Sequence, residues 1–267
     1  MRPKQLIFII LFFFLCSEVI ALDGLEIMKR AYYTYRNGME GKTEIEKIKV
    51  ELIDISRGAR RHRIIVRKIF YKEIGKDRAL FITLAPEALK GTTLLVFRAG
   101  FQKGFQKLDQ MWLWLPEWKK YFQLALQEKT YFVGLPLSYI DLSQLMGEDW
   151  WNYKYKVLDE NEKYWILKVL PKRGTLTDYN FRLIHIRKDN LFPEKYEYYK
   201  KNGGKKELVC KEINRYFQVW RADRIEVREF SEGEPSSFIG KFEIMEREIR
   251  NVSEKYFSLK TLERQQW

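Results

Sequence analysis

Hydrophobic positions recur at helical intervals near the start of the chain and at intervals of two over most of the remainder. Leu25, Met28, Tyr32 and Tyr35 fall on one face of a helix, which predicts an amphipathic helix over Asp23–Asn37. Beyond it, alternating runs separated by Gly, Pro, Asp and Asn breakers predict β-strands. The expected strands are Thr43–Ser56, Arg60–Glu73, Arg78–Leu84, Thr92–Arg98, Gln106–Leu115, Lys120–Leu126, Asp149–Leu158, Tyr164–Leu170, Asp178–Arg187, Lys195–Lys200, Lys205–Val219, Arg224–Phe230 and Ser237–Glu246, with Phe257–Lys260 as a candidate last strand.

A second helix is predicted over Leu137–Met146. Ser138 and Asp141 have the spacing of a capping box, and Gly147 stands where a left-handed residue commonly ends a helix. A sheet of ten or more strands curls or closes, and two helices are then available to cover its apolar side. The pattern therefore predicts a mainly β (α+β) fold, a large curled antiparallel sheet that forms a half-open barrel with a helical lid. We expect a single domain over residues 22–267, because no linker, repeat or low-complexity run interrupts it.

Three motifs occur in order along the chain: Pro86 with Lys90-Gly91-Thr92, then Trp112 to Pro116, then Gly134 with Ser138-Tyr139, Asp141 and Leu142. Together they resemble the outer-membrane lipoprotein-sorting family, the LolA-like periplasmic proteins. The resemblance implies the LolA/LolB-like half-barrel fold and a carrier that binds the acyl chains of a lipoprotein or lipid. Two positions depart from the family pattern. Pro136 stands where an acidic residue is usual, and Phe122-Gln123 occupy the place of a basic residue.

The first 21 residues have the pattern of a signal peptide. Arg2 and Lys4 precede an apolar run over Leu6–Leu15, and Ala21 ends a stretch of the kind that signal peptidase cleaves. The apolar run is shorter than the roughly 20 residues that span a bilayer. We expect cleavage after Ala21 and release into the periplasm as a protein that begins at Leu22. A retained membrane anchor is the alternative interpretation.

The mature chain is strongly basic and has a single cysteine. The full sequence carries a net charge of +13, and removal of the signal peptide takes away two basic residues and one acidic residue, which leaves +12. Cys210 then has no partner for an internal disulfide. The basic residues are interleaved with glutamates and form no nucleic-acid motif, so we expect no nucleic-acid partner. An anionic membrane surface or simple solvation explains the excess instead.

Residues suited to catalysis or metal binding are sparse. His62 and His185 both lie in predicted strands, with no acidic residues or cysteines at metal-ligand spacing. The chain has no nucleophile elbow, metalloprotease motif, phosphate-binding loop or dinucleotide fingerprint. The sequence therefore favours a protein that is not an enzyme and has no cofactor or metal.

Aromatic residues, in contrast, make up 16% of the chain. Several alternate with polar residues along strands, as core residues do, but a curled sheet covered by two helices also leaves room inside. An acyl chain suits such an apolar space, since each buried methylene contributes about 0.8 kcal/mol. The residues expected to line this cavity and its lid are Trp112, Trp114, Phe132, Tyr139, Leu142, Leu145, Trp151, Tyr153, Tyr155 and Trp165.

Three functional hypotheses remain open on the sequence. The first is a periplasmic carrier or acceptor of lipoprotein or lipid acyl chains that serves transport to, or sorting at, the outer membrane. The second is a lipid-binding accessory of an inner-membrane transporter of the RND exporter type. The third is a structural envelope protein whose own side chains fill the barrel.

Overall fold

The computed structural model describes residues 22–55, 60–73, 77–98, 109–124, 150–175, 177–231 and 234–264. In this part of the chain, 13 strands form one antiparallel sheet. Their order is β6-β5-β4-β3-β2-β1-β13-β12-β11-β10-β9-β8-β7. The strands are β1 (Lys42–Asp54), β2 (Arg60–Lys72), β3 (Arg78–Ala85), β4 (Thr93–Phe97), β5 (Gln110–Leu115), β6 (Lys120–Leu124), β7 (Tyr153–Glu160), β8 (Tyr164–Pro171), β9 (Tyr179–Arg187), β10 (Pro193–Lys200), β11 (Lys205–Tyr216), β12 (Val219–Ser231) and β13 (Glu234–Arg250).

The first and last strands of the chain pair with each other in the middle of this sheet. β1 and β13 run antiparallel from Thr43 opposite Arg250 to Asp54 opposite Phe238. On either side, each strand pairs with its neighbour in sequence, which leaves β6 and β7 as the two edges. Sequential antiparallel neighbours need only short connections, so the topology follows directly from the run of alternating segments.

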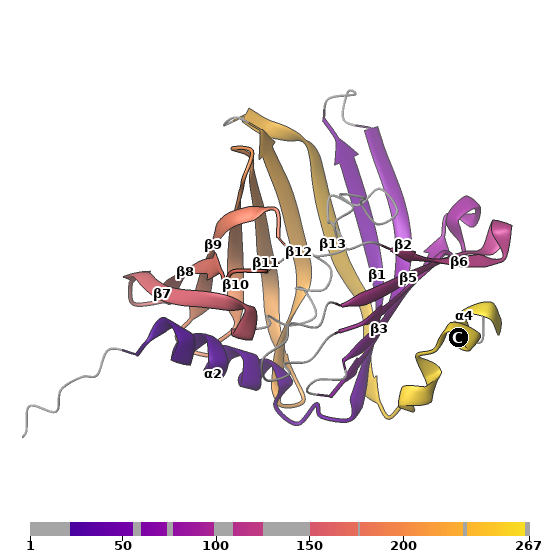
Figure 1. Cartoon of the computed structure of the whole chain (residues 1–267), viewed down its shortest axis with the longest axis horizontal. Helices are drawn as coiled ribbons and strands as arrows, with labels where there is room; N and C mark the ends of the chain where they lie inside the picture. Colours follow the sequence, from indigo (N-terminus) through magenta and orange to yellow (C-terminus); the bar gives the residue numbers. More distant parts are fainter. Residues whose placement is uncertain are drawn as a thin grey trace, which may run out of the picture.

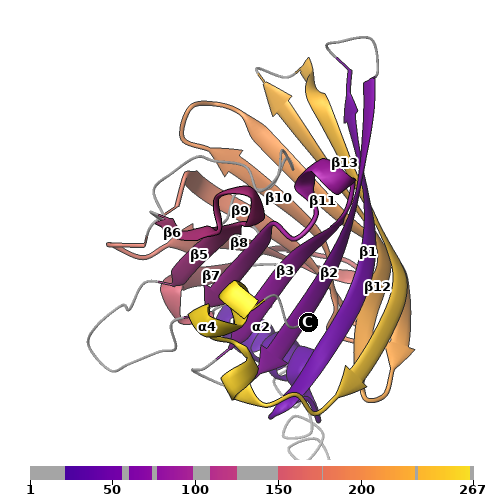
Figure 2. The same cartoon turned by 90° about the vertical axis from the view of Figure 1, so that its right-hand side faces the viewer.

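The sheet is strongly curved, and the two α-helices of the described residues lie on opposite faces of it (Figures 1 and 2). Helix α2 (Gly24–Arg36) covers the concave face beside β7, and the short helix α4 (Leu259–Arg264) packs outside the β2–β5 half. Cross-strand partners share a face, so the register assigns every inward side chain. In β1, Ile48, Val50 and Leu52 belong to the large apolar cluster of the concave face.

Helix α2 is held to the sheet by an apolar stripe at helical spacing. Ile27, Met28 and Ala31 are buried in one cluster with side chains of β7, β8 and β9. Gly24 lets the helix approach closely, because a Cβ there would stand 3.1 Å from backbone atoms of β7. The sheet side of this cluster consists of Tyr153, Tyr155, Leu167, Val169, Ile184 and Ile186. The helix predicted over Asp23–Asn37 is thus confirmed.

One predicted strand extends too far, and another is wrong. The prediction Lys205–Val219 matches β11 (Lys205–Tyr216) over most of its length. Lys205–Val219 is interrupted by a hairpin turn after β11, and Phe217 there has a left-handed φ of 54°. No Gly, Pro or Asn marks this turn, so the pattern gave no break. Phe257–Lys260 is not a strand, because Ser258 Oγ accepts from the Thr261 amide at 3.3 Å and α4 begins at Leu259.

One further predicted strand begins later than expected, and one predicted helix is untested. The strand expected over Asp149–Leu158 is preceded by a 3-10 turn over Trp150–Asn152, and β7 begins only at Tyr153. The helix expected over Leu137–Met146 lies outside the described residues.

Candidate functional site

The candidate site lies on the concave face, between α2 and strands β7 to β9. Tyr153 and Tyr155 point from β7 toward α2 and are buried, and Trp165 on β8 shares their face and is half-buried. Trp151 precedes them in the 3-10 turn and packs edge-on against Tyr32 of α2, with ring centroids 5.9 Å apart. The structure therefore brings these four predicted aromatic residues together beneath one helix.

A buried cation lies in the same aromatic layer. Arg182 on β9 is 1% exposed, and its guanidinium carbon lies 4.2 Å from the Tyr153 ring centroid and 5.9 Å from that of Tyr198. A guanidinium stacked on aromatic faces keeps a favourable electrostatic environment without water. The sequence pattern did not reveal Arg182, because Phe181 and Leu183 make the opposite face of β9 equally apolar.

A cleft of about 400 Å³ runs along one side of α2, from Ile27 near its N-terminal end to Thr34 near its C-terminal end. Apolar side chains contribute much of its wall, and two cations stand among the polar residues around it. Lys188 lies with its ammonium 5.4 Å from the Trp165 ring centroid and 2.8 Å from a Glu160 carboxylate oxygen. The lining residues are Leu22, Ile27, Arg30, Thr34, Trp165, Lys188, Asp189, Asn190, Leu191 and Trp220. Trp165 alone among these had been predicted.

The opposite end of α2 is fixed by buried ion pairs. Arg36 donates from both terminal nitrogens to Asp77, at 2.7 and 2.9 Å. Arg221 of β12 donates to the Tyr35 carbonyl at 3.1 Å and pairs with Glu44 of β1 at 2.9 Å. A bidentate guanidinium–carboxylate pair has a fixed geometry, so these contacts anchor the end of the helix.

The environment of this ion cluster changes the pKa values of its members. Burial alone would raise the pKa of the Glu44 carboxyl, but Arg221 and Lys72 together hold it well below its usual range. Burial, assisted by the charge of Arg221, lowers the pKa of Lys72 to about 7, although Glu44 opposes that shift. The cluster continues from Glu46 to Arg247 of β13 at 2.8 Å and to Lys68 at 2.7 Å. These side chains come from β2, β1, β13 and β12, which are four adjacent strands of the sheet.

Trp112 and Trp114 lie away from this site. Their neighbours Met111 and Leu113 belong to the concave face, so the two tryptophans point from β5 to the outer face. There Trp114 is 4% exposed and packs in a cluster that contains Phe257 and Leu262 from the C-terminal segment. We therefore leave both tryptophans out of the proposed cavity. The predicted residues Phe132, Tyr139, Leu142 and Leu145 lie outside the described residues.

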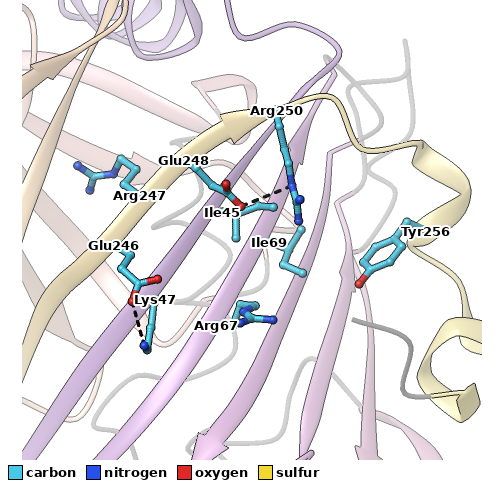
Figure 3. A pocket seen from close by; sticks show the side chains of 9 residues that line it. All are labelled: Ile45, Lys47, Arg67, Ile69, Glu246, Arg247, Glu248, Arg250 and Tyr256. Carbon is cyan, nitrogen blue, oxygen red and sulfur yellow. Dashed lines mark hydrogen bonds and ion pairs between the residues drawn. The ribbon is translucent and has the colours of Figure 1, made fainter.

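A second, smaller hollow of about 250 Å³ lies on the outer face under Tyr256 (Figure 3). Its floor includes Ile45 and Ile69, and its walls carry charges that are mostly paired. Lys47 bonds Glu246 at 2.9 Å, and Arg250 bonds Glu248 at 3.5 Å. None of the predicted site residues lines it.

Other reactive side chains have ordinary structural surroundings. His185 pairs with Glu197 at 3.0 Å, and burial raises the pKa of the Cys210 thiol to about 12. In the described ranges, no three His, Cys, Asp or Glu side chains gather as a metal site would require. Within the same ranges, every helix is too short or too polar to cross a membrane.

Solved structures with the same fold include three with high coverage. A domain from Vibrio parahaemolyticus, provisionally named an outer membrane lipoprotein-sorting protein domain, has a TM-score of 0.78 and 20% identity, over 90% of this chain and 98% of that one. A DUF1329 family protein from Desulfovibrio piger has a TM-score of 0.75 and 19% identity, over 90% and 97%. A LolA superfamily protein from Nitrosomonas europaea has a TM-score of 0.64 and 13% identity, over 90% and 100%.

These matches define the fold as LolA-like, which confirms the resemblance drawn from the sequence motifs. A family model described as that of an uncharacterized protein matches residues 75–264, which is most of the chain, and the chain belongs to that family. No curated protein matches the sequence significantly.

Proposed function

We propose that this protein is a non-enzymatic periplasmic carrier or acceptor that binds the acyl chains of a lipoprotein or lipid. One observation carries the proposal. The cleft along the side of α2 has Trp165 and Ile27 in its wall, and both side chains also pack in the apolar cluster beneath the helix. A ligand in this cleft would therefore lie at the edge of the apolar layer of the concave face. The LolA-like fold supports the same function.

The chemistry of the cleft suits an acyl chain with a polar end. Leu22, Leu191 and Trp220 offer apolar contact, and each methylene that leaves water contributes about 0.8 kcal/mol. Arg30 and Lys188 stand beside these residues and can face an anionic or ester group. The curved sheet, as a half-open barrel, would hold the remainder of the chain against its concave face.

Helix α2 is the element that would move to admit the ligand. Its C-terminal end is anchored by Arg36–Asp77 and by the Arg221 bond to Tyr35, and the cleft runs along its side from Ile27 to Thr34. A small rotation about the anchored end would widen the cleft and expose the apolar layer below. Hinged elements of this kind move on microsecond to millisecond timescales.

Export to the periplasm is part of the proposal. The signal-peptide pattern of residues 1–21 supports cleavage after Ala21. N-terminal sequencing of the exported protein is expected to begin at Leu22. Recovery of an intact Met1 segment in the membrane fraction would replace release with anchoring.

The binding site is tested by replacing Trp165. Trp165→Ala is expected to weaken binding of a fluorescent fatty acid about tenfold, because a large apolar wall of the cleft is lost. The matched control is Trp112→Ala, which removes the same half-buried side chain type from the opposite face and should leave binding unchanged. The measurement is fluorescence titration of the mature protein.

The same preparations separate a carrier from a structural protein. Lipid extraction and native mass spectrometry of the wild type are expected to find an acyl-bearing ligand. A wild type that contains none and takes up no fatty acid would contradict the carrier function and favour a structural envelope protein.

A further inference from the structure

The hairpin of β5 and β6 exposes a group of large aromatic side chains at one edge of the sheet. Trp118 is 60% exposed, Phe122 39% and Tyr121 37%, whereas Trp114 a few residues earlier is 4% exposed. Trp118 and Phe122 pack edge-to-face with ring centroids 5.7 Å apart, and Tyr121 beside them packs against Trp112. Exposed apolar side chains that gather in a patch commonly mark an interaction surface.

The aromatic patch is basic and its shape is fixed. Lys119 and Lys120 follow Trp118 directly and are exposed, against one exposed acidic residue, Glu117, in the same turn. Lys119 has a left-handed φ of 49° that closes the turn before β6. The β5–β6 ladder from Met111–Leu124 to Leu115–Lys120 holds the turn at the end of the sheet (Figure 1).

The rings extend to both sides of the hairpin. Tyr121 pairs with Trp114 on the outer face, and Phe122 pairs with Leu113 on the concave face. A flat protein surface would cover only one of these sides. A lipid interface can bury exposed rings on both sides of an edge hairpin.

We propose that the β5–β6 hairpin docks the protein on an anionic bilayer surface. Trp118, Tyr121 and Phe122 lie at head-group level, where Trp and Tyr are the preferred residues, and the two lysines meet lipid phosphates. The basic charge of the whole chain, +13, complements the same surface. This docking is separate from acyl-chain binding in the cleft, which lies on the other half of the sheet.

The experiment is co-sedimentation of the mature protein with vesicles of phosphatidylcholine alone or mixed with phosphatidylglycerol. The wild type is expected to bind the anionic vesicles and not the neutral ones. Combined Trp118→Ala and Phe122→Ala should lower the partition coefficient at least about tenfold, because both rings leave the interface. Combined Lys119→Gln and Lys120→Gln should lower it about fivefold per lysine and flatten its salt dependence.

Phe217→Ala is the matched control, because Phe217 is 73% exposed at the turn between β11 and β12. It should bind vesicles like the wild type, and thermal unfolding should show that all variants remain folded. Three outcomes would overturn the proposal: no binding of the wild type to anionic vesicles, equal binding to neutral ones, or equal losses in Phe217→Ala. Because no acyl probe is used, failure here leaves the carrier function unaffected.

Discussion

Glu44→Gln is expected to lower the free energy of unfolding by about 3–5 kcal/mol, because it leaves buried cations without their carboxylate. Glu44 and Lys72 are fully buried, and Arg221 is 4% exposed. The amide of glutamine can still accept a hydrogen bond but carries no charge to offset Arg221. Urea unfolding of both proteins at neutral pH measures the difference.

The matched control is Glu246→Gln on β13. Glu246 bonds Lys47 at 2.9 Å on the outer face, with 68% of its side chain exposed. Water screens such a pair, so its loss should cost at most about 1 kcal/mol. Equal effects of the two substitutions would show that the buried cluster is not what fixes α2 to the sheet.

The effect of Glu44→Gln should also depend on pH. Arg221 and Lys72 hold the pKa of Glu44 well below the unfolded value of about 4.3, so the ionised carboxylate contributes stability that is fully present above that value. This contribution is lost as the pH falls through the pKa of the folded state. The difference between wild type and variant should therefore shrink as the pH falls below about 4.3. A difference that grows in that range would have the wrong sign for a carboxylate of lowered pKa.

Much of the fold could be predicted because alternation and helical spacing are local properties of the sequence. Helix α2 and most strands follow from these two patterns. Each element ends near the residue where its pattern of hydrophobic positions ends. The turn at Phe217 could not be predicted, since its left-handed residue is not one of the usual types. The segment after Tyr256 could not be assigned either, since Leu259 and Leu262 suit a short helix or a strand until Phe257 and Leu262 are seen to pack together.

The site was harder to predict because alternation does not say which face is inward. In β5, Met111 and Leu113 alternate with Trp112 and Trp114, and both sets are apolar. Only pairing with β4 assigns the tryptophans to the outer face.

Buried charged residues also mislead the pattern, because charged positions in a strand are normally expected to face water. The inward positions Glu44 and Glu46 of β1 read as a solvated edge in the sequence. They are buried because Lys72 and Lys68 of β2 and Arg221 and Arg247 of more distant strands supply their counter-charges. The two lysines come from the neighbouring strand β2, but Arg247 and Arg221 are brought to the glutamates only when β1 pairs with β13, a contact between opposite ends of the chain.

Met28→Ala is expected to weaken the attachment of α2 by about 2–5 kcal/mol, the usual cost of truncating a buried methionine. Met28 is 1% exposed and belongs to the apolar cluster between α2 and strands β7 to β9. Tyr33→Ala is the control on the same helix, because Tyr33 is 53% exposed and its loss should change stability by about 0.5 kcal/mol or less.

The location of the stability loss in Met28→Ala tests whether α2 moves as the carrier function requires. If α2 opens about its anchored end, hydrogen exchange in Met28→Ala should accelerate over Gly24–Ala31 more than in β1 or β13. Uptake of the fluorescent fatty acid should then become faster, because the open form is more populated. Equal acceleration across the sheet, with unchanged uptake, would mean that α2 is a fixed part of the core and that the ligand enters elsewhere. The anchors at Arg36 and Arg221 make the first outcome the expected one, since they hold the end of the helix that the substitution does not touch.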